Sequence, residues 1–399
     1  MIDWRQVQSV GVVGLGQTGY SVVEYLVQKQ VQVSVFDSRM SPPYLQSVRD
    51  QHPQVEIHLG DLRTEQLEYL DFLVLSPGID PRHDVIQSWT SAGRPVHGDI
   101  ELFCQEATAP IIAVTGSNGK SSLVTMIGQA MHEGRKVAYV GGNVGVPALS
   151  LLSKPTPDYY VLELSSFQLE TVSSLRDHVA VVSNYSPDHL DRYQDFAQYV
   201  STKNTIYRNA RVAIVNHDQL DCVGRIEGER RVGFSVNGLA DFSLEDHQGE
   251  RMVCFQREPV CAVSEFSLQG QHHWQNALIL MAVLQSVDFS LDIARAVLQS
   301  FQGLPHRCEL VSSKNGVSWY NDSKATNESS AIAAIKSIAP FCQGSVILIA
   351  GGDAKGALLS DLQSVVAAEV DHVIVLGKDQ ELLCGLMSPV SNVFRVACL

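Results

Sequence analysis

The stretch at residues 111–122, IIAVTGSNGKSS, constrains the fold of this chain more than any other. Apolar residues run into Gly116 and Gly119, and apolar positions then recur at helical spacing. This pattern predicts a strand, a glycine turn and a helix. Such a turn exposes backbone N–H groups at the positive end of a helix, where Lys120 can reach outer phosphates and Ser121 can bind Mg²⁺. A glycine turn without a ligand is the alternative.

The length and composition of the chain exclude several classes of protein. The length of 399 residues predicts two or three domains, and 45% hydrophobic with 18% charged residues is typical of a well-buried chain. A net charge of −14 argues against binding to nucleic acid or to an anionic membrane. Eight scattered cysteines without a CxxC pair indicate free thiols in a reducing compartment. Without an apolar signal core or a long apolar run, we expect no membrane insertion and a cytoplasmic, monomeric protein.

A second glycine motif, GLGQTG, lies near the N-terminus at residues 14–19. It follows an apolar run at residues 10–13, and the next apolar run, residues 31–36, ends at Asp37. In a dinucleotide fingerprint an acid about 20 residues after the glycines binds ribose hydroxyls. Another apolar run leads to the Ser-Pro-Gly loop that ends at Gly78. A dinucleotide, another nucleotide diphosphate and a purely structural turn are all compatible with this pattern.

Polar residues also follow strands in the middle of the chain. A glycine loop occupies residues 141–145, Glu163 ends an apolar run, and the run at 179–182 leads to His189. An acid and a histidine at neighbouring strand ends are suitable Mg²⁺ ligands. The alternatives are a helix cap for Glu163 and a surface loop position for His189. By composition alone, Lys203 is an ordinary surface lysine.

Residues 220–270 contain short alternating apolar runs, including 232–236, which predict small antiparallel strands. The next helix carries Asn276 in its first turns. We expect His272 and His273 to cap or pack this helix, because neighbouring helical positions point about 100° apart.

Glycine and proline within residues 301–307 predict a hinge, after which strand and helix signals recur. These signals are strands at 317–320, 345–350 and 373–376 and a helix at 331–338. The predicted fold class is therefore α/β, with a Rossmann-like domain (1–108), a central P-loop ATPase-like domain (109–303) and a short third Rossmann-like domain (304–399). Ligands of such sheets bind at the carboxyl ends of the strands, so one cleft would hold a nucleotide-like group, ATP–Mg²⁺ and a third reactant.

Eight motifs, in this order, resemble those of the Mur ligases of peptidoglycan synthesis: GSNGKSS, GGNVG, ELSSFQLE, DHLDRY, GQHHWQNAL, GLPHR, NDSKATN and GGDAKG. With GLGQTG and SPGI in front, the resemblance spans most of the chain. It implies an ATP-dependent ligase in which a carboxylate attacks the γ-phosphate and becomes an acyl phosphate, from which an amine then displaces phosphate to form the amide. The N-terminal motif and ELSSFQ favour the members that join D-glutamate to UDP-N-acetylmuramoyl-L-alanine.

The resemblance also implies site residues. The ATP phosphates and Mg²⁺ would lie on Gly116, Ser117, Asn118, Gly119, Lys120, Ser121 and Ser122, and the rest of ATP on Asn276, His306, Arg307 and Asp322. The metal ligands would be Ser121, Glu163, His189 and a carbamylated Lys203, and the catalytic residues Lys120, Glu163, His189 and Lys203. The UDP group would contact Thr18, Asp37, Ser38, Arg39 and Gly78. The muramoyl-alanine portion would face Asn143, Ser165 and Gln168, and D-glutamate would approach Lys324, Thr326 and Lys355.

One departure from the family concerns the C-terminus. The family continues past residue 399 with a strand and a Leu-Ser-Pro-type loop, which we do not equate with Ser388-Pro389. We therefore expect an incomplete third domain with an unpaired sheet edge. A ligase that binds nucleotide without completing ligation is one alternative. Others are a folylpolyglutamate synthetase-like enzyme, another Mur ligase, a non-enzymatic remnant, and an NAD-dependent oxidoreductase, which would leave the phosphate loop unexplained.

Overall fold

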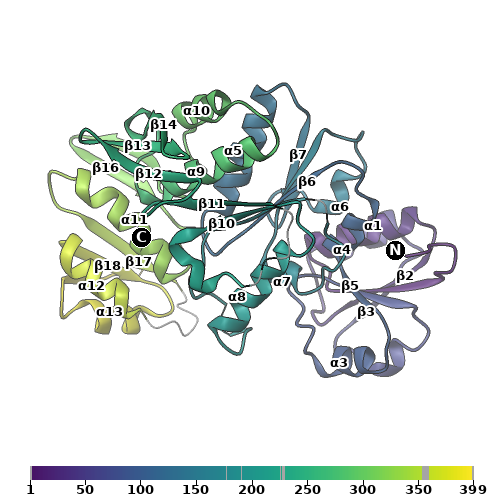
Figure 1. The fold of residues 1–399 in the computed structure, drawn as a ribbon. Coiled ribbons are helices and arrows are strands. Elements are labelled where there is room, and N and C mark those ends of the chain that lie inside the picture. Colours follow the sequence, from purple (N-terminus) through teal and green to yellow (C-terminus); the bar gives the residue numbers. More distant parts are fainter. Residues whose placement is uncertain are drawn as a thin grey trace.

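The computed structural model describes residues 2–176, 178–189, 191–224, 226, 230–352 and 359–397. Three α/β units follow one another along the chain, with the N-terminal unit at one end of the molecule, the central unit in the middle and the C-terminal unit at the other end (Figure 1). The predicted fold class is therefore confirmed.

The N-terminal unit is a parallel sheet in the order β3-β2-β1-β4-β5. Its strands are β1 (Ser9–Val13), β2 (Gln32–Asp37), β3 (Glu56–Leu59), β4 (Phe72–Leu75) and β5 (Val96–Gly98). Its helices are α1 (Gln17–Gln28), α2 (Leu45–Gln51), η1 (Thr64–Gln66), α3 (Asp84–Ser91) and α4 (Asp99–Glu106). All five residues of β1 are buried, as expected of a parallel strand covered on both faces. A Cβ at Gly19 would lie 1.9 Å from the Gly14 carbonyl oxygen, so glycine allows α1 to pack this closely.

The central unit is a nine-stranded sheet in the order β14-β13-β12-β11-β10-β9-β6-β8-β7. Its strands are β6 (Ile111–Thr115), β7 (Ala138–Gly142), β8 (Tyr159–Glu163), β9 (Val179–Val182), β10 (Val212–Asn216), β11 (Arg230–Ser235), β12 (Phe242–His247), β13 (Glu250–Phe255) and β14 (Glu258–Ala262). Its helices are α5 (Lys120–Glu133), α6 (Ala148–Leu151), α7 (Ser166–Leu169), α8 (Phe196–Asn204), η2 (Thr205–Tyr207), η3 (His217–Cys222), η4 (Val263–Glu265), α9 (Gln271–Ser286) and α10 (Leu291–Ser300).

The core of the central unit forms where α5, α9 and α10 pack together on the sheet. Helix α9 is buried from Asn276 to Leu284, and every residue from Ala277 to Leu284 is apolar. A helix without a polar face is stable only when neighbours cover it on all sides.

The prediction of antiparallel strands within 220–270 is partly wrong. Strand β11 pairs in parallel with both β10 and β12, and only β12, β13 and β14 form antiparallel pairs. Periodicity alone does not distinguish the two directions, which depend on how the chain returns to the sheet. Here the connection from β10 includes η3 and is long enough for a crossover.

The C-terminal unit contains a hairpin of β15 (Glu309–Lys314) and β16 (Val317–Asn321) and a parallel sheet in the order β17-β18-β19. The other elements are β17 (Ile347–Gly351), β18 (His372–Leu376), β19 (Asn392–Arg395), α11 (Glu328–Ile338), η5 (Ala339–Phe341), α12 (Ser360–Glu369) and α13 (Gln380–Met387).

The strand predicted at 317–320 pairs only within this hairpin, not with the parallel sheet, among the residues described. The physical reason is the two-residue turn at Asn315 and Gly316, whose φ values of 55° and 77° favour a tight hairpin. Every helix in the described parts of the chain is too short or too polar to cross a lipid bilayer.

Candidate active site

The turn between β6 and α5 has the backbone geometry of an anion cradle. Gly116 and Gly119 have φ values of 148° and 80°, which side-chain-bearing residues rarely adopt. A Cβ at Gly116 would also lie 2.0 Å from Ser183 Oγ. Gly119 is the N-cap of α5 and no side chain caps it, which leaves the helix N-terminus available to an anion. We call residues 116–122 the phosphate loop.

Lys120 lies over this loop. Its Nζ donates to the carbonyl oxygens of Gly116 at 2.9 Å and Ser117 at 3.0 Å. Burial lowers the pKa of Lys120, against the opposing effect of the nearby Glu163 and Asp188 carboxylates. The amine is therefore held at the loop by two uncharged carbonyl acceptors.

A chain of hydrogen bonds connects four segments at the carboxyl ends of β6 and β8. Ser121 Oγ donates to Glu163 Oε2 at 2.7 Å, Asn143 Nδ2 donates to Glu163 Oε1 at 2.9 Å, and Arg307 Nη2 donates to Ser121 Oγ at 2.9 Å. Glu163 is only 1% exposed, so its carboxylate is held in one orientation. A hydroxyl and a carboxylate beside a phosphate loop are suitable Mg²⁺ ligands. Arg307 reaches this point from the C-terminal unit.

Lys203 lies beneath the same loop. It is 2% exposed, and its Nζ donates to the Gly116 carbonyl oxygen at 2.8 Å and to Thr115 Oγ1 at 3.3 Å, above the Tyr199 ring. The interpretation as a surface lysine is wrong, because Tyr199 and Lys203 share the buried face of α8 at a spacing of four residues. Burial, and then the charge of Lys120, lower the pKa of Lys203 well below its ordinary value. Its amine therefore loses its proton more readily than that of a lysine in water.

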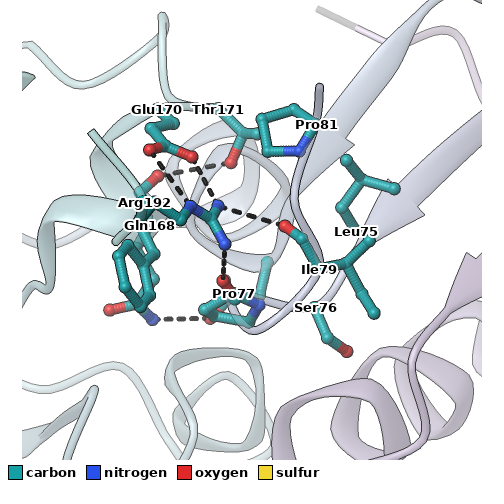
Figure 2. A pocket seen from close by; sticks show the side chains of 11 residues that line it. Leu75, Ser76, Pro77, Ile79, Pro81, Gln168, Glu170, Thr171 and Arg192 are labelled. Atoms are coloured by element: carbon teal, nitrogen blue, oxygen red, sulfur yellow. Dashed lines mark hydrogen bonds and ion pairs between the residues drawn. The ribbon is translucent and has the colours of Figure 1, made fainter. Parts of the chain in front are cut away.

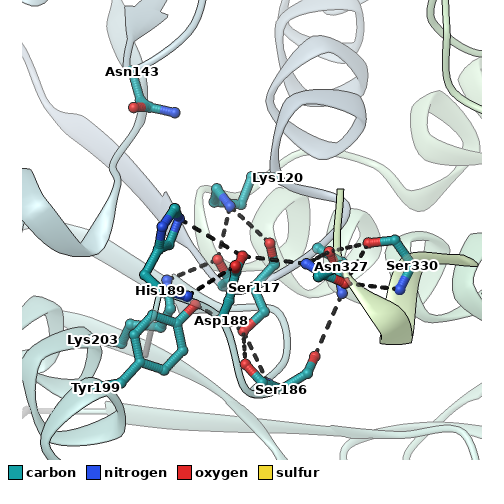
Figure 3. Close-up of polar contacts among 12 residues, drawn as sticks. Ser117, Lys120, Asn143, Ser186, Asp188, His189, Tyr199, Lys203, Asn327 and Ser330 are labelled. Carbon is teal, nitrogen blue, oxygen red and sulfur yellow. Dashed lines mark hydrogen bonds and ion pairs between the residues drawn. The ribbon is translucent and has the colours of Figure 1, made fainter. Parts of the chain in front are cut away.

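The loop after β9 brings His189 and Asp188 to this cluster (Figure 3). His189 Nε2 lies 3.7 Å from Asp188 Oδ2, and the imidazole packs against the Phe167 ring with 4.8 Å between centroids. His189 has a φ of 54°, in the left-handed region that few residues other than glycine adopt. His189 was predicted from the sequence as a metal ligand, whereas the adjacent Asp188 was not.

The C-terminal unit contacts the phosphate loop through the start of α11. Asn118 Oδ1 accepts from Ser330 Oγ at 2.7 Å and from Asn327 Nδ2 at 3.3 Å, and Asn327 Nδ2 also donates to Asp188 Oδ2 at 3.2 Å (Figure 3). Asn327 is the N-cap of α11. Its position before a helical pattern was the only signal in the sequence, and it predicts a cap rather than a contact between units.

Of the predicted ATP-binding residues outside the phosphate loop, Asn276 lies directly beside it, and the others lie in the C-terminal unit. Asn276 is 4% exposed and lies beside Gly119, whose Cβ would be 3.3 Å from Asn276 Oδ1. Asp322 accepts from the Cys308 N–H at 3.0 Å, and burial raises its pKa. His306 lies against the same segment, where Nδ1 pairs with Asn321 Nδ2 at 2.8 Å.

The predicted glutamate-binding residues are in the segment that follows. Lys324 donates its backbone N–H to the His306 carbonyl oxygen at 3.2 Å, and Thr326 immediately precedes Asn327. Lys355 lies outside the described residues. Lys324 and Thr326 therefore lie just before Asn327, where the C-terminal unit contacts the phosphate loop.

The predicted UDP site lies at the carboxyl ends of β1, β2 and β4. Asp37 Oδ2 accepts from the Leu15 N–H at 2.7 Å and from Arg39 Nη2 at 2.6 Å. Burial acts to raise the pKa of Asp37, but these hydrogen bonds hold it below its ordinary value. Thr18 is in the first turn of α1, Ser38 is exposed, and Gly78 follows β4. Asp37 thus orders the glycine turn through its bond to the Leu15 N–H.

The predicted sugar-facing residues Ser165 and Gln168 form a capping box at α7. Ser165 Oγ accepts from the Gln168 N–H at 3.2 Å, and Gln168 Oε1 accepts from the Ser165 N–H at 3.1 Å. Gln168 Nε2 donates to Asp99 Oδ2 at 3.0 Å, across the boundary between the N-terminal and central units. Burial raises the pKa of Asp99 to about 6. Both groups of the Gln168 amide are therefore engaged within the protein.

Arg192 links the N-terminal unit to the central unit (Figure 2). Its guanidinium donates to Glu170 Oε2 at 2.6 Å in the central unit, and to the carbonyl oxygens of Pro77 at 3.4 Å and Ile79 at 3.1 Å in the N-terminal unit. The Arg192 and Glu170 side chains are only 9% and 14% exposed. This pair was not predictable from the sequence, because its two members are 22 positions apart and no motif includes both.

Comparison with protein families finds three models in order along the chain. They are the Mur ligase MurD-like N-terminal domain at residues 8–98, the Mur ligase middle domain at 114–284 and the Mur ligase glutamate ligase domain at 306–392.

The chain is similar to curated proteins along nearly all of its length. It is 41% identical to the UDP-N-acetylmuramoylalanine–D-glutamate ligase of Pseudomonas syringae pv. tomato, covering 96% of this chain and 86% of that protein. It is 40% identical to the ligase of the same name from Pseudomonas aeruginosa, covering 97% and 87%.

Solved structures share the fold at lower identity. UDP-N-acetylmuramate-alanine ligase MurC from Thermotoga maritima matches with a TM-score of 0.62 and 16% identity, covering 97% of this chain and 90% of that one. MurF ligase from Thermotoga maritima, solved in complex with ADP, matches with a TM-score of 0.60 and 15% identity, covering 100% and 87%. On the family models and the identity to the curated relatives, the chain belongs to the Mur ligase family of ATP-dependent ligases.

Proposed function

We propose that this ligase joins D-glutamate to UDP-N-acetylmuramoyl-L-alanine in peptidoglycan precursor synthesis. The names of its relatives support this substrate pair, and the MurD-like N-terminal model supports it over other Mur ligases. The observation that carries the proposal is the hydrogen-bonded chain from Arg307 through Ser121 and Glu163 to Asn143, because it joins the phosphate loop to three other segments. The domain boundaries after residues 108 and 303, a cytoplasmic location and a monomeric state are part of the same proposal.

The residues present fit ATP and Mg²⁺. The positive φ values of Gly116 and Gly119 and the uncapped start of α5 suit a polyphosphate, and Lys120 can exchange its carbonyl acceptors for phosphate oxygens. Ser121 and Glu163 would hold Mg²⁺, and His189 a second ion. Bound Mg²⁺ would neutralise charge that develops on the phosphates.

The chemistry follows from the poor electrophilicity of a carboxylate. A carboxylate oxygen of the alanine portion forms a bond to the γ-phosphorus while the bond to the β-phosphate oxygen breaks, which gives an acyl phosphate and ADP. The D-glutamate nitrogen then attacks the acyl carbon, loses a proton and expels inorganic phosphate, which leaves the amide. Lys120 and Arg307 supply positive charge at the transferred group, and Asn276 lies beside the loop that positions it.

The burial of Lys203 favours its carbamylation. A neutral amine attacks the carbon of CO₂ and loses a proton, which gives a carbamate anion that can bind Mg²⁺. Burial lowers the pKa of Lys203 and so favours the neutral amine, and its position below Gly116 is within the candidate metal region. We therefore propose carbamylated Lys203 as a metal ligand or as a group that orients one.

The two substrates would approach from opposite units. The UDP group would bind at Thr18, Asp37, Ser38, Arg39 and Gly78, with the muramoyl-alanine portion directed past Asn143 and Ser165 toward the phosphate loop. D-glutamate would approach from the C-terminal unit near Lys324, Thr326 and Lys355.

Phosphate release under omission of each reactant tests the proposed function. The complete mixture of ATP, Mg²⁺, UDP-N-acetylmuramoyl-L-alanine and D-glutamate should release phosphate and form the amide product, and each omission should reduce the rate to background. Lys120→Ala should release no phosphate, whereas Lys136→Ala, which alters an exposed lysine paired with Asp158, should behave like the wild type. Substrate-dependent release with another amino acid, but not with D-glutamate, would refute the assignment.

A further inference from the structure

A group of metal-ligand side chains lies away from the phosphate loop, on the hairpin of β12 and β13. Glu245 and His247 are two positions apart on β12, so their side chains project from the same face. Cys254 on β13 is paired with Ser243, which is two positions before Glu245 and therefore on that face too. Strand alternation and register thus bring a carboxylate, an imidazole and a thiol together.

The ligand atoms are close enough to share one ion. Cys254 Sγ lies 3.5 Å from His247 Nε2, His247 Nε2 lies 4.0 Å from Glu245 Oε2, and all three groups lie within 4.8 Å of one another. In tetrahedral zinc sites, bond lengths of about 2.3 Å to sulfur and about 2.05 Å to nitrogen place those two atoms roughly 3.6 Å apart. The sulfur–nitrogen distance already matches, and only the carboxylate has to move inward.

The surroundings suit such a site. Ser243 Oγ, in a buried residue, donates to Glu245 Oε1 at 2.7 Å, which orients the carboxylate and leaves Oε2 on the side of His247. Cys254 is buried, whereas the Glu245 and His247 side chains are 23% and 37% exposed. An ion can therefore enter from solvent, and water can occupy a fourth position.

We propose that Glu245, His247 and Cys254 bind one divalent ion of the zinc class. The thiol loses its proton to solvent as the sulfur–metal bond forms, the imidazole binds through Nε2, and the carboxylate binds through Oε2. Sulfur and nitrogen ligands favour Zn²⁺ over Mg²⁺, so the Mg²⁺ required for ligation does not compete. Within the described residues, this is the one place where three such side chains converge. The ion would connect β12 to β13 near the edge of the central sheet and take no part in phosphoryl transfer.

Cobalt binding to the full chain tests this site, because Co²⁺ occupies zinc sites and a thiolate–cobalt bond absorbs near-ultraviolet light. With excess Mg²⁺ and no nucleotide, the wild type should develop this absorption to one equivalent, and Zn²⁺ should abolish it. Cys254→Ser should lack the absorption. Cys261→Ser should retain it, since buried Cys261 on β14 pairs with Val253 and lies on the opposite face.

A second variant separates loss of a ligand from loss of the fold. His247→Gln alters a partly exposed side chain and should weaken Zn²⁺ binding at least about tenfold while the far-ultraviolet circular dichroism and the ligase rate stay unchanged. Absence of the absorption in the wild type would overturn the proposal, as would equal Zn²⁺ affinity in the wild type and His247→Gln. Loss of binding in His189→Ala with retention in His247→Gln would place the ion at the phosphate loop and also overturn it.

Discussion

Lys203 shows how burial changes the chemistry of a single residue. Its amine donates to the Gly116 carbonyl oxygen and lies above an aromatic ring, with its pKa far below that of a lysine in water. The sequence alone predicted an ordinary surface lysine here, and only the family resemblance pointed to carbamylation. The reason is physical: a lysine in a helix carries no local sign of which face the fold will bury.

We predict that ligation depends on CO₂ through Lys203. Removal of CO₂ and bicarbonate should lower the rate of the wild type, and added bicarbonate should restore it, because the neutral amine forms a carbamate reversibly. Lys203→Ala should be slow under both conditions, and exposed Lys136→Ala should respond like the wild type. Steady-state phosphate release checks this, and a Lys203→Ala rate equal to that of the wild type would refute the role.

Asp99 gives a prediction for stability against pH. Burial raises its pKa to about 6, so the folded state binds the proton more tightly than the unfolded chain. Asp99 therefore destabilises the fold progressively as the pH rises from about 4 to about 6. Asp99→Asn removes this titration. The stability of the variant relative to the wild type should be greater at about pH 7.5 than at about pH 4, by on the order of 3 kcal/mol.

Urea unfolding of both proteins at the two pH values measures this difference. A constant difference between them would show that Asp99 has an ordinary pKa in the folded protein. Asp241→Asn is a suitable control, since Asp241 accepts from the Gly233 N–H and lies outside the boundary between the N-terminal and central units.

At the scale of elements, the phosphate loop was the most predictable part of the chain. The strand, turn and helix occur where the apolar pattern places them, because glycine requirements and helical spacing are local properties. The direction of β11 and the isolation of the β15–β16 hairpin were not predictable in this way. Both depend on how distant segments return to a sheet.

Gly119→Ala tests the loop as a structural element. A residue with a side chain at φ 80° is strained by roughly 1 kcal/mol, and its Cβ would approach Asn276 Oδ1 at 3.3 Å. Gly93→Ala is the matched control, because Gly93 has a φ of 76° with open space around it, after α3. Both variants should lose similar stability in urea, but only Gly119→Ala should weaken ATP binding in calorimetry. Equal ATP affinity in both variants would contradict the role of the loop.

At the scale of the whole molecule, the candidate active site is assembled by contacts between units. Arg307, Asn327 and Ser330 reach the phosphate loop from the C-terminal unit, and Arg192 joins the central unit to the loop after β4. The family resemblance indicated Arg307, whereas Asn327, Ser330 and Arg192 were missed. Contacts between residues far apart in the chain leave no local pattern in the sequence of one protein.

Arg192→Ala should loosen the boundary between the N-terminal and central units. Removing one partner of a buried ion pair costs about 3–5 kcal/mol, because Glu170 keeps an uncompensated charge. Hydrogen exchange should rise in residues 76–81. Arg82→Ala is the control in the neighbouring segment, since the pair of Arg82 with Asp80 is exposed and contributes about 1 kcal/mol or less. Equal hydrogen exchange in residues 76–81 of the two variants would show that Arg192 does not hold the two units together.

The central claim is that these three units meet in order to activate a carboxylate by phosphorylation. Its most direct test uses UDP-N-acetylmuramoyl-L-alanine with a heavy oxygen isotope at both oxygens of its carboxylate, together with ATP, Mg²⁺ and D-glutamate. The attacking oxygen stays with phosphorus when the amine expels phosphate, so mass spectrometry should find one labelled oxygen in each phosphate released. Phosphate without the label, formed together with the amide product, would contradict the claim.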